Sequence, residues 1–275
     1  MTCARRRGGG ERDDSGMMQA VLSVQRTDAE IGLARAFHSE RPPRMSVPSR
    51  SSPIPPHAQT LPRGVLGLAA AVLLVLLALS GWQPYDRTTW VLEVLPVVAA
   101  LAVLAATRRR FPLTPLLYGL VFVHACVLMY GGAFSYARVP LGFEIAHWLG
   151  MERNPYDKIG HFFQGFVPAI AAREILLRGH HVRAGRMLAF LVVCVVLAIS
   201  ASYELVEWAA ALALGQGAEE FLGTQGYEWD TQSDMFYALL GSLAALILLS
   251  RLHDRQLRRL EPLRACLLYT SDAAD

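Results

Sequence analysis

Long apolar stretches constrain this 275-residue chain more than any other feature of its sequence. Hydrophobic residues make up 53% of the chain and charged residues only 18%, and the apolar residues gather in blocks. A helix needs about 20 such residues to cross a hydrocarbon core of roughly 30 Å. We therefore expect an all-α protein, a polytopic membrane bundle of six transmembrane helices, and not a soluble enzyme. The expected helices are Leu61–Ser80, Trp90–Ala106, Leu113–Phe134, Gly160–Leu177, Met187–Ala211 and Asp234–Ser250.

Two of these stretches carry polar residues at membrane depth. The second stretch contains Glu93 and Pro96, and the fourth contains His161, Gln164, Pro168, Arg173 and Glu174. Ionisable side chains are costly in hydrocarbon unless they are paired or hydrated. We therefore expect neighbouring helices to shield both stretches from lipid.

The connections between the stretches differ in charge. If every stretch crosses the membrane, all the arginine clusters fall on one side, which is the cytoplasmic side by the positive-inside rule. Both termini are then cytoplasmic, and the acidic connections face outward. The arginines are Arg63, Arg108, Arg109, Arg110, Arg178, Arg183, Arg186, Arg251, Arg255, Arg258 and Arg259.

This topology brings three polar motifs to the outer leaflet. The motifs are DKIGHFFQGF (residues 157–166) at the start of the fourth helix, YELVEW (203–208) near the end of the fifth, and WDTQSDM (229–235) at the start of the sixth. Residues three or four apart share one face of a helix, so each motif presents its acids together. We expect one site that contains His161, Glu204, Glu207, Asp230 and Asp234.

Three interpretations of this site remain open. A histidine with carboxylates suits a divalent metal such as zinc, with His161, Glu204, Glu207, Asp230 and Asp234 as ligands and Asp157, one turn before His161, orienting the imidazole. Without a metal, His161, Glu204, Glu207 and Asp234 are candidate catalytic acids and bases. The third interpretation is a buried hydrogen-bond network that only sets helix register. Lys158, Gln164 and Tyr203 are the candidate substrate-binding residues, with Lys158 as an anion contact.

The functional hypotheses follow from these interpretations. The favoured one is binding of, or chemistry on, a lipid-linked or envelope substrate by an integral inner-membrane protein. A proton- or cation-coupled transporter would need a polar path toward the cytoplasm, for which the sequence offers only His124, Glu93 and Gln164. A noncatalytic membrane scaffold is the third hypothesis. The expected partners are the lipid bilayer and a small or lipid-linked ligand, and nucleic-acid-binding motifs are absent.

Other segments carry local predictions. Arg173 and Glu174 lie about 18 Å along the helix from His161 and are expected to anchor its cytoplasmic end. The segment LGFEIAHWLG (141–150) predicts a short amphipathic helix on the outer surface. Small residues that favour close helix contacts are Gly160, Gly165, Ala238, Gly241 and Ala245.

The two ends are kept apart from the fold. Residues 1–60 are rich in Arg, Ser, Pro and Gly and are expected to form a disordered tail, with Met45 as a plausible true start. Residues 61–259 form the expected transmembrane domain. Residues 260–275 form a cytoplasmic end whose last part, CLLYTSDAAD (266–275), has the character of a sequencing scar.

A resemblance rests on three segments, VPLGFEIAHWLGMERNPYDKIGHFFQGFVPAIAAREILLR, SASYELVEWAAAL and GTQGYEWDTQSDMFYALLG. They resemble the YjdF family of bacterial inner-membrane proteins, a family built on a domain of unknown function. The resemblance spans the six-helix body and implies a multi-pass plasma-membrane protein.

A fainter similarity links the chain to VanZ-like proteins through Asp157, Lys158, His161, Phe162, Glu204, Asp234 and Gly241. The chain departs from the VanZ-like pattern at Glu207, where those proteins tend to carry glutamine, and at Tyr237 or Ala238, which replaces their asparagine. A glycopeptide-resistance role is therefore not transferred.

Overall fold

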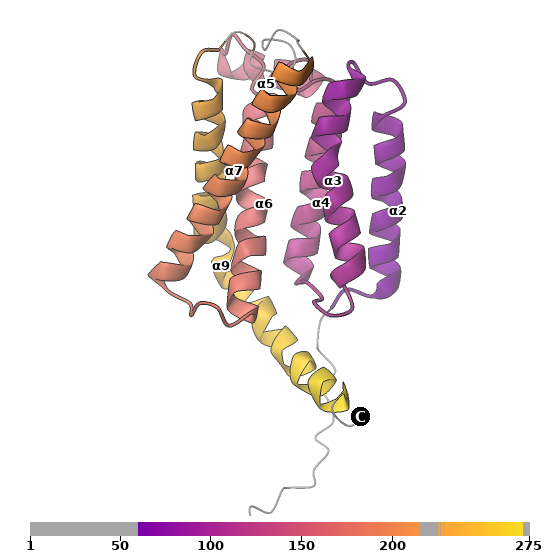
Figure 1. Cartoon of the computed structure of the whole chain (residues 1–275), viewed down its shortest axis with the longest axis vertical. Coiled ribbons are helices and arrows are strands. Elements are labelled where there is room, and N and C mark those ends of the chain that lie inside the picture. Colours follow the sequence, from indigo (N-terminus) through magenta and orange to yellow (C-terminus); the bar gives the residue numbers. More distant parts are fainter. Residues whose placement is uncertain (1–59, 215–224, 226, 272–275) are drawn as a thin grey trace, which may run out of the picture. The chain divides into compact units, whose positions relative to one another are not determined.

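The structure, a computed structural model, describes residues 60–214, 225 and 227–271, with side chains described as far as Leu260. Within these residues the chain is helical and contains no strand. The expected tail of residues 1–60 therefore lies outside the described residues except for Thr60. The helices are α2 (Arg63–Ser80), α3 (Arg87–Thr107), α4 (Pro115–Ala133), α5 (Pro140–Leu149), α6 (Tyr156–Arg178), α7 (Arg186–Leu214) and α9 (Asp230–Ser271) (Figure 1).

Five of the described helices, α2, α3, α4, α7 and α9, are long and apolar enough to cross a membrane. All the apolar stretches expected from the sequence are helical, which confirms the all-helical membrane class. Helix α6 has 23 residues and is long enough to cross, but its charged side chains make it less apolar than these five helices. Helix α9 continues well past Ser250, because the segment that follows is rich in the strong helix formers Leu and Arg.

Local signals explain where several helices begin and end. Asp86 caps α3 by accepting a hydrogen bond from the Thr89 backbone N–H at 2.7 Å. Thr114 caps α4 in the same way, and Pro115 occupies the first turn, where a missing N–H has no cost. Helix α5 ends at Gly150, whose φ of 64° lies in the left-handed region that favours glycine.

The helices pack in two groups around α6. Helix α4 contacts α2 and α3, while α6 contacts α7 and α9 and also joins the two groups through α4. The α6–α9 interface is the most extensive, because glycines let the two backbones meet. A Cβ on Gly165 would collide with the Ala238 carbonyl, and one on Gly241 would collide with the Phe162 carbonyl. The close contact expected for these small residues is confirmed.

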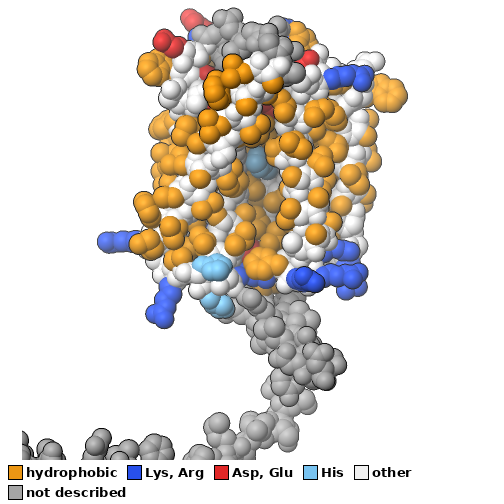
Figure 2. Space-filling model, in the orientation of Figure 1, with side chains coloured by type: hydrophobic (Ala, Val, Ile, Leu, Met, Phe, Trp, Pro, Cys, Tyr) orange, Lys and Arg blue, Asp and Glu red, His pale blue; other side chains and the backbone are white. Residues whose placement is uncertain are grey.

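The outer surface of the bundle matches a lipid environment. Hydrophobic side chains cover its sides, and Lys and Arg gather mainly at the end farther from α5 (Figure 2). We call the two ends the α5 end and the arginine end. The amphipathic helix expected over residues 141–150 is α5, which buries Gly142 and Ala146 and exposes Leu141, Phe143 and Trp148.

Candidate functional site

His161 is the centre of the polar site at the α5 end of the bundle. Its side chain is buried, with 7% of the residue exposed, and it faces acids from three helices. The Nε2 atom lies 3.5 Å from Asp157 Oδ1 and 3.9 Å from Asp234 Oδ2. The Nδ1 atom lies 3.8 Å from Glu204 Oε1 and 3.1 Å from Gln164 Oε1. The structure thus brings together the three motifs that the sequence analysis placed in one site.

The close packing of α6 on α9 explains this convergence. Asp157 and His161 are one turn apart on α6, so the spacing within the helix places them together. Asp234 comes from the first turns of α9, and the backbone contacts at Gly165 and Gly241 draw that helix against α6. Small residues at a helix interface allow side chains on both helices to reach one another.

The two nitrogens of His161 have different surroundings. Nδ1 faces the carboxylate oxygen of Glu204 and the side-chain carbonyl oxygen of Gln164. Both oxygens are hydrogen-bond acceptors, so the tautomer that carries its proton on Nδ1 is favoured. Nε2 then carries a lone pair that faces oxygens of Asp157 and Asp234. Three acceptors that converge in this way need a proton or a cation between them, held as a proton on Nε2, a proton on one of the two carboxyl groups, or a bound cation.

A metal-capable group lies on the Nε2 side. One ligand atom each from Asp157, His161 and Asp234 lies within 4.8 Å of the other two. Asp234 is only 2% exposed, and its Oδ1 atom has no hydrogen-bond partner. The buried Oε1 atom of Glu204 also lacks a partner. Imidazole and carboxylate ligands suit Zn²⁺, Mn²⁺ or Fe.

This group differs from the ligand set expected from the sequence. Asp157 was expected only to orient the imidazole, but it lies among the ligand atoms. Glu204, expected as a ligand, lies on the Nδ1 side, with its Oε1 atom 3.8 Å from Nδ1. Among the described side chains, Glu207 and Asp230 are not within 4.0 Å of His161. Helical spacing predicts which residues share a face, but the side-chain torsions decide which ring atom each residue meets.

A polar cavity of about 140 Å³ adjoins the imidazole between α3, α4, α6 and α7. Its polar lining includes Glu207 and the predicted substrate-binding residues Gln164 and Tyr203. It also includes Glu93, which accepts a hydrogen bond from Tyr203 Oη at 3.1 Å. The sequence analysis did not assign Glu93 to the site. Glu93 is an acid inside an otherwise apolar stretch. That pattern indicated that Glu93 must be shielded from lipid, but not which residue shields it.

Tyr136 forms another part of the cavity wall that the sequence did not reveal. Its ring lies against Gly131 and Gly160, where any Cβ would collide with it. Ser135 and Tyr136 both have left-handed φ angles, 54° and 45°, a strained conformation that concentrates at functional sites. Burial and the neighbouring Glu93 raise the pKa of Tyr136 well above its usual value, so the phenol keeps its proton.

Lys158 is placed differently from the predicted anion contact. Its Nζ lies 5.1 Å from the ring centroid of Tyr227 and 5.6 Å from that of Tyr237. Both distances suit cation–π attraction. Lys158 is not among the residues that line the cavity.

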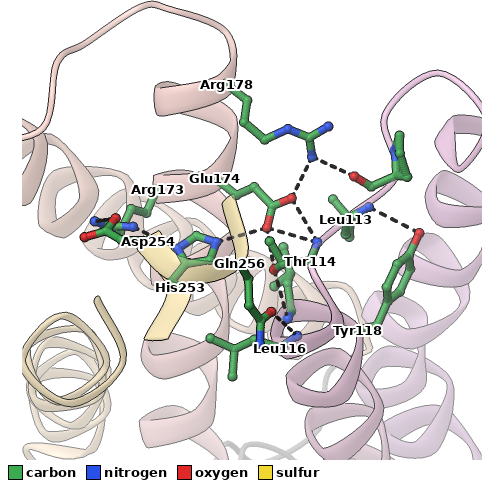
Figure 3. A network of polar contacts seen from close by, with 12 residues as sticks. Leu113, Thr114, Leu116, Tyr118, Arg173, Glu174, Arg178, His253, Asp254 and Gln256 are labelled. Atoms are coloured by element: carbon green, nitrogen blue, oxygen red, sulfur yellow. Dashed lines mark hydrogen bonds and ion pairs between the residues drawn. The ribbon is translucent and has the colours of Figure 1, made fainter. Parts of the chain in front are cut away.

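A second buried polar network lies at the arginine end (Figure 3). The fully buried carboxylate of Glu174 accepts hydrogen bonds from the Thr114 hydroxyl at 2.7 Å and the Arg178 guanidinium at 2.7 Å. His253 Nε2 lies 3.0 Å from the same carboxylate, and His253 Nδ1 lies 2.9 Å from Arg173 Nη1. An arginine can only donate, so Nδ1 accepts and Nε2–H donates to Glu174.

This second network joins α4, α6 and α9. Arg173 and Glu174, which were expected to anchor the end of their helix, thus have partners on two other helices. His253 was not predicted as a buried residue, because a histidine beside many arginines is typical of a charged helix end. Its donors and acceptors are matched to one another, which is typical of a structural network.

Membrane-length helices packed around buried histidine and carboxylate side chains define a polytopic α-helical membrane protein. Residues 65–255 match the model of a family described as predicted membrane protein, DUF2238. The inner membrane protein YjdF of Escherichia coli strain K12 is 60% identical over 201 residues, which cover 73% of this chain and 96% of that protein.

The chain therefore belongs to the YjdF (DUF2238) family, and it is a multi-pass inner-membrane protein. This confirms the resemblance drawn from the three sequence segments, while the fainter VanZ-like similarity stays a prediction. No solved structure matches the chain.

Proposed function

We propose that the protein crosses the inner membrane six times, with α6 as a shielded crossing and both termini in the cytoplasm. Two observations support this topology. Helix α6 has the length of a crossing, and its charged residues Arg173 and Glu174 are buried against other helices, so they do not face lipid. The arginine-rich connections lie at one end of the bundle (Figure 2). The α5 end then faces the periplasm, and the His161 site lies in the outer leaflet.

We propose further that this site binds a divalent metal, such as zinc, and acts on a lipid-linked or envelope substrate. The observation that carries the proposal is the convergence of three acceptor groups, from Asp157, His161 and Asp234, with one oxygen of Asp234 buried and unpartnered. Burying an unpartnered carboxylate oxygen is unfavourable, and a cation bound there would remove that cost. Three protein ligands leave a coordination position for water or substrate, as in catalytic zinc sites.

The other residues take roles that follow from their positions. Glu204 and Gln164 hold the Nδ1 side of His161, which orients the imidazole toward the metal. Glu207 lines the cavity beside the imidazole and is the candidate general base. Tyr203 and Tyr136 present hydroxyl groups in the cavity wall and are candidates to bind substrate oxygens. A metal at this position would polarise a phosphoryl or carbonyl oxygen or activate water.

Metal analysis of the purified full-length protein tests this proposal. We expect about one metal ion per chain in the wild type, and loss of the ion in His161→Ala and Asp234→Asn. Glu204→Gln removes only an orienting partner, so we expect metal affinity to fall by about 10- to 100-fold. His124→Ala is the matched control, because His124 lines the cavity but lies outside the ligand group.

Size-exclusion elution of each variant confirms that the protein is still folded. Absence of metal from the wild type after exposure to Zn²⁺ and Mn²⁺, or equal metal in wild type and His161→Ala, would contradict the metal site. A proton on His161 or on one of the carboxyl groups would then take the place of the cation, and the scaffold hypothesis would gain support.

One observation favours the transporter as a second candidate. The residues that the sequence offered as a polar path, Glu93, His124 and Gln164, all line the cavity beside His161. The cavity extends from Asp157 to Pro168 on α6, which is about 16 Å along the helix axis. For a transporter we expect Glu93→Gln to abolish proton or cation flux in proteoliposomes while metal binding is retained. Absence of flux through the wild type would exclude this candidate.

A further inference from the structure

A shallow, open apolar groove, whose lining residues all belong to α7, runs along the side of that helix next to the polar cavity. Its volume is about 440 Å³, and its lining includes Val195, Ile199, Ser202, Tyr203 and Val206. Ile199 and Tyr203 also line the polar cavity, so the apolar groove and the polar cavity meet at these two side chains. Figure 2 shows a hollow between the surfaces of α7 and α3, with a histidine side chain visible inside it.

This hollow opens toward the side of the bundle. The hydrogen bond from Tyr203 to Glu93 links α7 to α3 at that position. Both helices also carry exposed hydrophobic residues, including Leu95 and Val98 on α3 and Val206 on α7. In a membrane protein such surfaces face lipid, so a molecule that reaches the polar cavity by this route comes from within the bilayer.

The charge of the cavity restricts the head group of such a molecule. Glu93, Asp157 and Glu207 line the cavity, and its described lining contains no Lys or Arg. His161, when protonated, is therefore the cation closest to these acids. These carboxylates would repel a phosphate that arrives alone. A divalent cation held by Asp157, His161 and Asp234 would reverse the local sign and supply the usual partner of a phosphate oxygen.

We infer that the α7 groove holds the hydrocarbon chain of an amphiphile whose phosphate head group enters the polar cavity between α3 and α7. The phosphate would reach the metal from the side of Asp157 and His161, the two proposed ligand residues that line the cavity. This inference rests on the metal site proposed above. The residues that line the groove run from Val195 to Val206, which is about 16 Å along the helix axis, so the groove is long enough for a long hydrocarbon chain. Tyr203 lies at the junction, with its hydroxyl toward Glu93 and its ring in the wall of the groove.

Native mass spectrometry of the detergent-purified full-length protein tests this inference, because one spectrum resolves bound metal and bound amphiphile. The probe is hexadecyl phosphate, compared with hexadecanol, which lacks the phosphate, and with inorganic phosphate, which lacks the chain. We expect hexadecyl phosphate to bind metal-loaded protein one to one and to dissociate when the metal is chelated. We expect neither hexadecanol nor inorganic phosphate to bind at the same concentration.

A matched pair of variants tests the groove. Ser202→Trp places a large ring in the groove, and we expect it to weaken binding of hexadecyl phosphate by about tenfold or more while the metal stays bound. Leu205→Trp adds the same ring to α7 outside the groove lining, at a residue that is 62% exposed, and should leave binding unchanged.

Each contrary result has a distinct meaning. If hexadecanol binds as well as hexadecyl phosphate, the phosphate is not recognised. If inorganic phosphate binds as well as hexadecyl phosphate, the hydrocarbon chain is not recognised. Equal affinities of the two tryptophan variants place the chain elsewhere. Any of these results with metal retained overturns the amphiphile inference alone, whereas a protein without metal overturns the proposed function as well.

Discussion

At the scale of single residues, the two ring nitrogens of His161 lie near different acids. Asp157 and Asp234 lie near Nε2, whereas Glu204 lies near Nδ1. The sequence predicted that these acids meet the histidine, because helical spacing and membrane topology place them at one depth. It did not predict which acid meets which nitrogen. That choice depends on the torsions of one side chain, which the packing of three helices determines.

Glu174 illustrates the same point at the arginine end. Its carboxylate is fully buried and accepts hydrogen bonds from residues on two other segments. From the sequence it is one of several charged residues near the end of α6. Only the fold shows that it is enclosed by donors.

We predict that Glu174→Gln destabilises the protein strongly. The substitution replaces an acceptor oxygen by an NH₂ group that faces other donors, and breaking a buried charged network costs about 3–5 kcal/mol. Unfolding in mixed detergent micelles, followed by circular dichroism, measures the change. Glu144→Gln on the exposed surface of α5 is the control, and it should change the free energy of unfolding by less than about 0.5 kcal/mol. Equal free energies of unfolding for the two variants would show that the Glu174 network does not stabilise the fold.

At the scale of helices, the α6–α9 contact connects packing with chemistry. Gly165 and Gly241 allow the backbones to meet, and Asp234 reaches His161 because of that approach. The sequence predicted the small residues and their general purpose. The pairing of Gly165 with Ala238, and of Gly241 with Phe162, depends on the relative register of the two helices, which no local pattern contains.

We predict that Gly241→Ala both destabilises the protein and weakens metal binding. The added methyl group collides with the Phe162 backbone carbonyl, so the helices must separate at a cost of about 1–3 kcal/mol. Asp234 would move away from His161 at the same time. Thermal unfolding and metal titration of the same preparation measure the two effects.

Gly119→Ala is the control for this prediction. Gly119 lies in helix α4 with no atom within 4 Å of an added Cβ, so alanine there should be neutral or stabilise the helix by up to about 1 kcal/mol. If Gly241→Ala behaves like Gly119→Ala, the close contact between α6 and α9 is not required for the site.

At the scale of the whole molecule, orientation in the membrane decides what the site can meet. The proposed topology places α5 and the His161 site toward the periplasm, where envelope substrates are found. Exposed aromatic residues at this end, including Trp82, Trp148, Trp208 and Trp229, suit the membrane–water interface.

Cysteine labelling of intact cells tests this orientation. In a background without the four native cysteines Cys3, Cys126, Cys194 and Cys266, we expect Trp148→Cys to react with a membrane-impermeant maleimide and Arg183→Cys to react only after the membrane is opened. Both positions are exposed in the fold, so accessibility depends on sidedness. The reverse labelling pattern would place the site toward the cytoplasm and would contradict the proposal that its substrate lies in the outer leaflet.

By itself the sequence determined the membrane class, the positions of the helices, the family and the list of polar residues that belong near the α5 end. These depend on the length of apolar stretches, the distribution of arginines and spacing within single helices, all of which are read along the chain. The tertiary structure decided the rest, namely which nitrogen of His161 lies near Asp157 and which near Glu204, the place of Glu93 and Tyr136 in the cavity, and the meeting of cavity and groove at Tyr203. Those relations join residues far apart in sequence, and they depend on helix register and close packing, which no single segment encodes.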